Sequence, residues 1–174
     1  CVLFLYWVDD VVRVYVDTSG QSIAKHGYRT EPYKAPLQES LAAALMHSTT
    51  WNRQTNVVNP MCGSGTLAIE AALMATNSAP GLNRQNFGFM HLKGYTHSLW
   101  QDLCKHARSV IRPRITGRII ATDHSQEALD AAQQNARQAG VASLIEFKKC
   151  DFRDTPVPRG GGIVVLNPEY GERL

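Results

Sequence analysis

The sequence predicts an α/β fold with a doubly wound, mostly parallel sheet that is preceded by a β-hairpin. Three observations support this prediction. Short apolar strands alternate with helices from residue 56 onward, a glycine-rich turn joins the first of these strands to a helix, and a polar side chain follows each strand. Such alternation is typical of parallel sheets whose strands are connected through helices.

The composition indicates one soluble globular domain. A chain of 174 residues is long enough to bury a core, and its fractions of hydrophobic residues (44%) and charged residues (19%) are ordinary. The net charge of +3 comes from scattered Lys and Arg, which permits RNA contact without requiring it. No apolar run reaches the roughly 18 residues of a membrane helix, and the first residues lack the basic leader of a signal peptide. The 4 Cys show no paired spacing, so we expect a reducing, cytoplasmic location.

The first two predicted strands, residues 2–8 and 11–17, form a hairpin closed by Asp9-Asp10. Apolar and polar residues alternate in the second strand, which predicts one solvent-facing side. Residues 18–34 are rich in Gly, Ser and basic residues and are expected to be a loop.

A helix is predicted over residues 36–48, because Pro36 is favourable at a first helical position. Its spacing predicts an apolar face made of Leu37, Leu41, Ala44 and Leu45. A strand over 56–59, the glycine turn and a helix over 66–76 follow.

The second half contains an irregular section and then regular alternation. Residues 77–95 carry turn signals, and a helix over 97–111 is expected to end before Pro113. Strands are predicted over 118–122, 144–149 and 163–166. A helix over 125–139 has Ser125 as its N-cap and Gly140 just past its end.

The glycine turn is the first candidate site. Glycines such as Gly63 and Gly65 let a ligand approach the backbone closely, and the helix behind them offers unpaired N–H groups. Cys62 in this turn is expected to be a small packed residue rather than a nucleophile, because no base is paired with it.

Polar residues follow the four predicted strands of the sheet, namely Asn59, Asp123, Asp151 and Asn167. Ligands of doubly wound sheets bind beyond the carboxyl ends of the strands. A carboxylate at 123 can accept both hydroxyls of a ribose, and one at 151 can accept an adenine amino group while Phe152 covers the ring. Each aspartate taken alone could equally be a cap or turn residue.

The last segment places the amide of Asn167, the carbonyl of Pro168 and the ring of Tyr170 side by side. This trio suits an exocyclic amino group on a flat base. With the glycine turn, it indicates a methyl-donor site that faces a nucleobase site. The His residues show no ligand spacing, so no metal is expected.

Several segments resemble the THUMP-associated RNA methyltransferases. They are Gly27-Tyr28-Arg29 with the helix after Ala35-Pro36, the turn from Asn59 to Thr66, the insertion from Ala79 to Arg84, and Asn167-Pro168-Glu169-Tyr170-Gly171-Glu172-Arg173-Leu174. The chain is most similar to the bacterial large-subunit rRNA guanine-N2 methyltransferases. The resemblance implies a class I methyltransferase fold, S-adenosylmethionine as cofactor and RNA as partner, with rRNA favoured over tRNA. The residues that it implies are Asn167, Pro168 and Tyr170 for catalysis, and Asn59, Pro60, Cys62, Gly63, Ser64, Gly65, Asp123, His124, Asp151, Phe152 and Asn167 for cofactor binding.

The same resemblance divides the chain. Residues 1–34 would be the hairpin and linker of an RNA-binding domain that precedes this chain, and residues 35–174 part of a methyltransferase domain whose last strands are missing. The fourth strand would then be an exposed edge, which a further segment or a second copy in a homodimer would cover. Two residues depart from the family pattern: Asn59 replaces the usual Asp, and Glu169 replaces a second proline.

Three alternatives stay open. A module of this fold could bind RNA as a scaffold without turnover because of Glu169. A nicotinamide-dependent oxidoreductase is suggested by Gly63-Ser64-Gly65-Thr66-Leu67-Ala68, although its acidic residue should follow after about 20 residues rather than at Asp123. A DNA adenine methyltransferase shares the Asn-Pro-x-Tyr pattern, since it also acts on an exocyclic amine.

Overall fold

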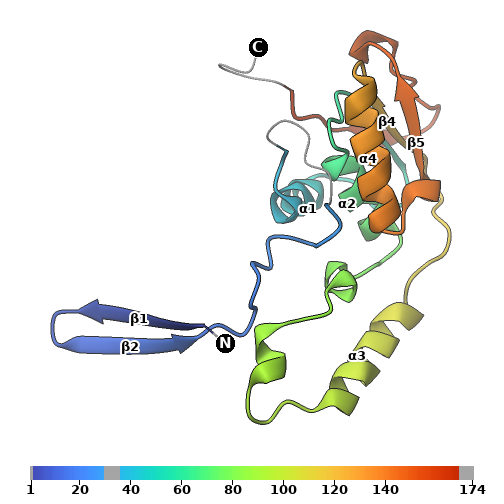
Figure 1. The fold of residues 1–174 in the computed structure, drawn as a ribbon. Coiled ribbons are helices and arrows are strands. Elements are labelled where there is room, and N and C mark those ends of the chain that lie inside the picture. Colours follow the sequence, from blue (N-terminus) through green and yellow to red (C-terminus); the bar gives the residue numbers. More distant parts are fainter. Residues whose placement is uncertain (1, 30–35, 169–174) are drawn as a thin grey trace.

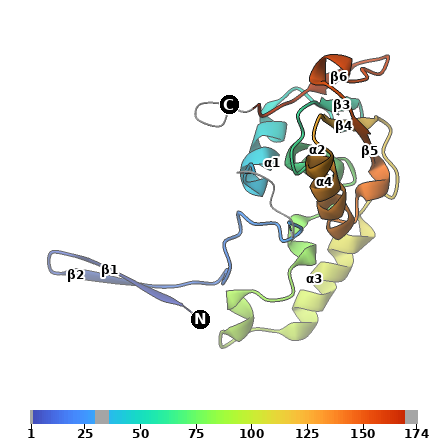
Figure 2. The ribbon, with the colours of Figure 1, turned by 45° about the horizontal axis from the view of Figure 1, so that its top comes forward.

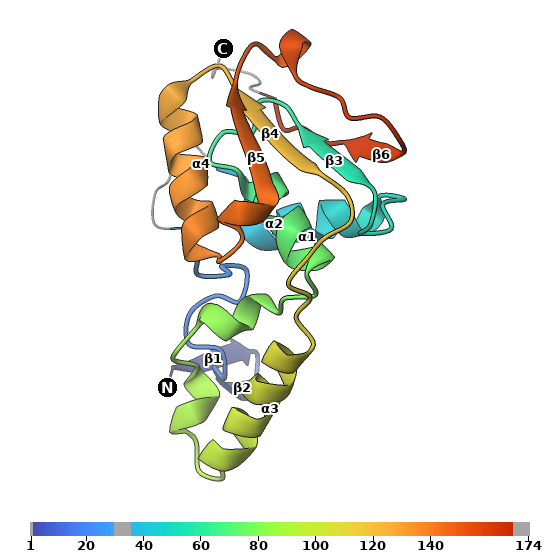
Figure 3. The same ribbon diagram turned by 90° about the vertical axis from the view of Figure 1, so that its right-hand side faces the viewer.

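The computed structural model describes residues 2–29 and 36–168, and it contains a helix-covered sheet, an insertion and a hairpin that extends away from the sheet (Figure 1). The sheet has four strands in the order β5-β4-β3-β6, namely Ile145–Lys149, Ile119–Asp123, Asn56–Asn59 and Gly162–Val164. All three pairings are parallel (Figure 3). The predicted fold class is confirmed, and β6, the fourth of the predicted sheet strands, lies at an edge of the sheet.

The two central strands are buried on both faces, as expected for a parallel sheet. Val57 and Ile119 belong to the core beneath the helices, while Val58 and Ile120, which point the other way, are also buried. Helices α2 (Thr66–Ala75) and α4 (Gln126–Gln138) cover one face. On the other face, the hydroxyl of Thr155 lies 2.7 Å from that of Thr122 and ties the connection before β6 to the sheet.

Helix α4 begins and ends where local signals predict. The Ser125 hydroxyl accepts a hydrogen bond from the Ala128 N–H, as an N-cap does. Gly140 adopts the left-handed region (φ 73°), and the N–H of Val141 bonds back to the carbonyl of Ala136.

Helix α1 (Glu39–Ser48) corrects two predictions. It begins at Glu39 rather than at Pro36. Its buried residues are Glu39, Ala42 and Met46, while Leu41 and Leu45 are 47% and 45% exposed. The reason is that α1 packs on α2 and not on the sheet. The small Ala42 permits this close helix–helix contact. The buried face of α1 is therefore determined by its packing on α2 and not by which of its residues are most hydrophobic.

The hairpin forms as predicted but lacks a buried face. Strands β1 (Leu3–Val8) and β2 (Val11–Val16) pair antiparallel, and Val8 opposes Val11 across the Asp9-Asp10 turn. Both faces are exposed, from 45% for Val8 to 74% for Trp7, because the hairpin reaches away from the rest of the chain (Figure 2). The prediction of one dry face was therefore wrong within this chain.

The insertion after α2 consists of two short 3-10 turns, Pro80–Asn83 and Gly88–His91, and helix α3 (His97–Ser109). Trp100 of α3 packs edge-on against Phe87 and Phe89. The insertion also holds the chain that leaves the hairpin, because the N–H of Phe89 bonds to the carbonyl of Thr18 at 2.7 Å. Gly88 permits this approach, since a Cβ there would lie 2.5 Å from the Asp17 carbonyl oxygen.

Two leucines in helices of equal length test this account of the core. Leu129 of α4 is 2% exposed and Leu103 of α3 is 53% exposed. We expect Leu129→Ala to lower the free energy of unfolding by about 2–5 kcal/mol, because it leaves a cavity between α4 and the sheet. Leu103→Ala should change it by less than about 0.5 kcal/mol. Chemical denaturation measures both, and equal losses would contradict the placement of the two helices.

Candidate functional site

The glycine turn between β3 and α2 is bound to the neighbouring strand β4. The N–H of Cys62 donates to the carbonyl of Thr122 at 2.9 Å, and the N–H of Gly65 closes the turn on the carbonyl of Cys62 at 2.8 Å. Gly65 has a φ of 81°, and a Cβ there would lie 2.9 Å from the Cβ of Ala132 in α4. Glycine at 65 is therefore required both by the backbone conformation and by the contact of α4 with the turn.

Gly63 has a different role. Its φ of 54° is in the left-handed region, but apart from its two chain neighbours no atom of residues 2–29 and 36–168 lies within 4 Å of where its Cβ would be. Open space next to a glycine backbone, at the N-terminus of a helix, is what a closely bound ligand needs. The predicted ligand residues Pro60 and Ser64 are buried beneath this opening, whereas Gly63 itself is half-buried.

Asp123 joins the turn to the end of β4. One carboxylate oxygen accepts the Gly63 N–H at 2.9 Å and the other accepts the Ser125 N–H at 3.0 Å. The side chain is almost wholly buried, while the neighbouring His124 is exposed and places its Nδ1 3.5 Å from the carboxylate. The sequence suggested a hydroxyl acceptor or a turn residue for Asp123. The structure shows the turn contacts, and each oxygen retains a further lone pair for a ligand.

Asp151 and Phe152 follow β5 at the same edge of the sheet, which we call the carboxyl edge because the strands end there. Both oxygens of Asp151 bond to the guanidinium of Arg153, at 2.8 and 3.0 Å. Arg153 thereby holds the pKa of the Asp151 carboxyl below its usual value. Phe152 is 53% exposed, and the Arg153 guanidinium lies over its ring, 5.8 Å from the ring centroid. The Arg153 contact was not predicted, and its only sequence signal is a basic residue two positions after the aspartate.

Asn59 lies deepest in the site, with 1% of its surface exposed. Its side-chain amide donates to the carbonyl of Val165 at 2.9 Å, and its Oδ1 is buried without a partner among the described residues. Asn167 and Pro168 follow Val165 and are exposed at the carboxyl edge. Tyr170 and Glu169 lie outside the described residues.

The structure thus brings together the ends of four strands: Asn59 with the glycine turn, Asp123, Asp151 and the segment before Asn167. Contacts through Asp123 and Asn59 connect three of these strand ends directly. Among the described residues, this edge therefore has one buried acceptor without a partner, the Asn59 Oδ1, and one glycine backbone with open space beside it.

Cys62 is packed under the turn, as predicted. It is 8% exposed, and burial together with the nearby Asp123 carboxylate raises the pKa of its thiol far above the usual value. A neutral buried thiol is a poor nucleophile.

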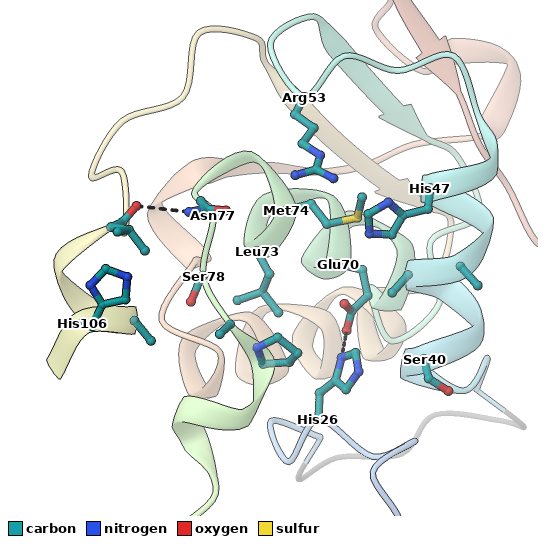
Figure 4. A pocket seen from close by; sticks show the side chains of 16 residues that line it. His26, Ser40, His47, Arg53, Glu70, Leu73, Met74, Asn77, Ser78 and His106 are labelled. Carbon is teal, nitrogen blue, oxygen red and sulfur yellow. Dashed lines mark hydrogen bonds and ion pairs between the residues drawn. The ribbon is translucent and has the colours of Figure 1, made fainter. Parts of the chain in front are cut away.

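A second feature is a cavity of about 740 Å³ between α1, the C-terminal half of α2 and the end of α3 (Figure 4). Glu70 lies at its base. Its Oε1 accepts the Tyr28 hydroxyl at 2.8 Å and lies 2.7 Å from Nδ1 of His26. The cavity contains no residue of the glycine turn or of the other strand ends, so it is separate from the carboxyl edge.

Residues 26–29, which link the hairpin to the rest of the chain, also contact α2, the helix that follows the glycine turn. The Arg29 guanidinium donates to the Thr66 hydroxyl at 2.9 Å and lies 3.7 Å from a carboxylate oxygen of the buried Glu39. Residues 26–29 thus attach the chain that leaves the hairpin to both α1 and α2.

In the described part of the chain, no three His, Cys, Asp or Glu side chains lie closely enough together to hold a metal ion. Among the helices of residues 2–29 and 36–168, none has both the length and the apolar character needed to cross a membrane.

Comparison with known proteins identifies the relatives of this chain. The model of the RMKL-like methyltransferase domain matches residues 26–174. The ribosomal RNA large subunit methyltransferase K/L of Aliivibrio fischeri is 41% identical over 163 residues, which are 91% of this chain. The chain spans only 23% of that relative.

Solved structures support the same fold. SMU.472, crystallised in complex with SAH, superposes with a TM-score of 0.90 at 34% identity over 99% of this chain and 45% of its own. A protein of Listeria monocytogenes, named a predicted N6-adenine-specific DNA methylase, gives a TM-score of 0.88 at 37% identity with the same coverage.

Thiol alkylation tests the packing of Cys62. We expect iodoacetamide to modify Cys104 and Cys150, which are half-buried, well before Cys62, because Cys62 is buried and the pKa of its thiol is raised. Peptide mass spectrometry of the folded protein at mildly alkaline pH measures the three rates. Equally fast modification of Cys62 would show an accessible thiolate in the turn.

The His26–Glu70 contact predicts a pH-dependent contribution to stability. The hydrogen bond between His26 and Glu70 raises the pKa of His26 in the folded state. The contribution is therefore fully present below the ordinary histidine pKa of about 6.5 and is lost as pH rises through the raised value. We expect the loss of unfolding free energy in His26→Ala to shrink over this range.

Tyr28→Phe is the matched control, because it removes a neutral donor from the same oxygen of Glu70. Its cost, about 1.5–3 kcal/mol for a hydrogen bond to a charged group, should not vary over the same pH range. Denaturation curves at several pH values compare the two, and a pH-independent cost for His26→Ala would refute the ion pair.

Proposed function

The chain belongs to the RMKL-like methyltransferase domain family, and on that premise we propose that it carries the catalytic edge of an S-adenosylmethionine-dependent RNA methyltransferase. The proposed reaction is methylation of the exocyclic N2 of a guanine, with large-subunit rRNA as the substrate. One observation carries the proposal: the open glycine turn, the Asp123 carboxylate and the Asn167-Pro168 segment lie at the same edge of the sheet.

S-adenosylmethionine supplies an already activated methyl group. The open backbone at Gly63 and the free lone pairs of Asp123 would hold its ribose, in keeping with the position of a carboxylate at the end of the second strand. Phe152 would cover the adenine, and Asp151 would accept a hydrogen bond from the amino group of that ring. The Asp151 carboxylate would make this bond in addition to its contact with Arg153. The Oδ1 of Asn59, which is buried without a partner among the described residues, would accept the ammonium of the methionine end once ligand binding uncovers it.

Asn167 and Pro168 would act on the base. The amino lone pair of guanine is delocalised into the ring, so the nitrogen is a poor nucleophile. An Asn167 side-chain oxygen and the Pro168 carbonyl can accept its two N–H groups, which orients the nitrogen toward the methyl donor and favours a tetrahedral geometry. The protein thus contributes mainly alignment and electrostatic stabilisation.

Tyr170 would stack on the base once it has left its helix or loop. This role rests on the motif alone, as does the effect of Glu169, which adds a negative charge close to the target amine.

The choice of RNA rests on the resemblance and on the name of the 41% identical relative, a ribosomal RNA methyltransferase. We propose further that the hairpin and linker, residues 1–34, belong to an RNA-binding domain and that residues 35–174 are part of the methyltransferase domain. The boundary at 34/35 lies outside the described residues. The exposed apolar hairpin is consistent with a segment that packs against an RNA-binding domain. Within residues 2–29 and 36–168 no strand pairs with the outer side of β6, and a further segment or a second copy in a homodimer would cover it.

The rival substrate is an adenine in DNA, because the Listeria monocytogenes relative is named for that activity. Both reactions use an exocyclic amine, so the same acceptors would serve. The family assignment leaves the alternative of a nicotinamide-dependent oxidoreductase without support. If the chain is a scaffold module without turnover, it should bind the cofactor but transfer no methyl group.

Nucleoside mass spectrometry distinguishes these outcomes. The protein carrying this chain is incubated with S-adenosylmethionine and unmodified rRNA, tRNA or DNA, and we expect N2-methylguanosine in rRNA. Appearance of N6-methyladenine in DNA would show that the substrate is an adenine in DNA and not a guanine in rRNA. Cofactor binding without any modified nucleoside would favour the scaffold module.

Two substitutions separate catalysis from cofactor binding. We expect Asn167→Ala to lower kcat on the order of 100-fold, because it removes one acceptor of the reacting amine, and to leave the Kd for S-adenosylhomocysteine nearly unchanged. Asp123→Ala should instead raise that Kd by about 10-fold or more, because hydrogen bonds to a charged group are lost. Calorimetric titration and single-turnover assays measure both. Equal loss of binding in the two variants would refute this division of roles.

A further inference from the structure

The ladder between β3 and β6 lacks one backbone hydrogen bond at the carboxyl edge. The N–H of Asn56 donates to the Gly161 carbonyl at 3.2 Å, and the N–H of Val165 donates to the Val58 carbonyl at 2.9 Å. In a parallel ladder the next bond would run from the N–H of residue 60 to the carbonyl of Val165. Residue 60 is a proline and has no N–H, so the backbone cannot make this bond.

The side chain of Asn59 replaces the missing donor. Its Nδ2 lies 2.9 Å from the Val165 carbonyl oxygen and 3.3 Å from that of Pro60. Both neighbours are acceptors, so the amide has to present its NH₂ group to them and keep its Oδ1 on the other side. Because Asn59 is only 1% exposed, water cannot take over this contact in the folded protein.

The contact is placed where it can affect the proposed catalytic residues. Val165 follows the last paired residue of β6, and Asn167 and Pro168 come two and three positions later. They are exposed, and Asn59 holds the carbonyl at the point where the ladder ends.

We infer that Asn59 is a positioning residue that sets the place of Asn167 and Pro168 by donating to the Val165 carbonyl in place of Pro60. This inference rests on the proposed function. In this inference the side-chain NH₂ of Asn59 holds the segment that follows β6, while its Oδ1 is left for a contact with a cofactor.

Asn59→Ala and Asn59→Leu test the inference in the protein carrying this chain. Removing the donor in Asn59→Ala should increase amide hydrogen exchange in a peptide covering residues 163–167 and lower kcat by about 10- to 100-fold, with little change in the KM for RNA. Asn59→Leu keeps a side chain of similar volume without an NH₂ donor and should lower kcat similarly.

Asn56→Ala is the matched control. Asn56 lies at the other end of β3. Its Nδ2 donates to the carbonyls of Gly161 at 3.1 Å and Arg159 at 3.3 Å, and its Oδ1 accepts the Arg118 N–H at 3.0 Å, so the substitution removes at least as many side-chain contacts far from the carboxyl edge. It should leave kcat and the exchange of residues 165–167 within about 2-fold of the unsubstituted protein.

Unchanged exchange of residues 163–167 in Asn59→Ala would overturn the inference, and so would faster exchange with an unchanged kcat. If the unsubstituted protein transfers no methyl group to any substrate, the proposed function fails. The exchange comparison would then still decide whether Asn59 holds this segment.

Discussion

The buried carboxylate of Asp123 is the constraint on which the rest of the site depends. It accepts the N–H of Gly63 from one turn and the N–H of Ser125 from another, so one side chain holds the starts of α2 and α4 at fixed positions relative to β4. A carboxylate that accepts two backbone N–H groups forms stronger hydrogen bonds than a neutral side chain would. The open face of Gly63 is kept in place by this contact and by the Cys62–Thr122 backbone bond.

The linker at residues 26–29 is attached to the same helix, α2, that begins at the glycine turn. Tyr28, His26 and Arg29 contact α1 and α2 through Glu70, Glu39 and Thr66, so the chain that leaves the hairpin is attached to the helix that starts at the glycine turn. The insertion holds the same chain nearer the hairpin, through Phe89 and Thr18. A path of packed contacts therefore runs from the hairpin to the carboxyl edge. In the proposed enzyme this path would keep bound RNA in register with the base site.

Local signals were sufficient to predict much of the fold from the sequence. Strand β3 was predicted at its observed bounds, and Ser125 and Gly140 delimit α4 because capping depends on neighbouring residues. The buried face of α1 and the exposure of both hairpin faces were mispredicted, since they depend on which element lies next to each segment. In the candidate site, the polar strand ends were predicted as a set. The contacts of Asn59 with Val165 and of Asp151 with Arg153 were not, because they depend on strand order and side-chain conformation.

A crystal structure of the protein carrying this chain with S-adenosylhomocysteine bound would decide whether the carboxyl edge is a cofactor site. We expect the ribose hydroxyls at the Asp123 carboxylate, the ligand against the backbone of Gly63 and the adenine beside Phe152. Density for the ligand in the cavity between α1, α2 and α3, or an orientation that leaves Gly63 and Asp123 without contact, would contradict it.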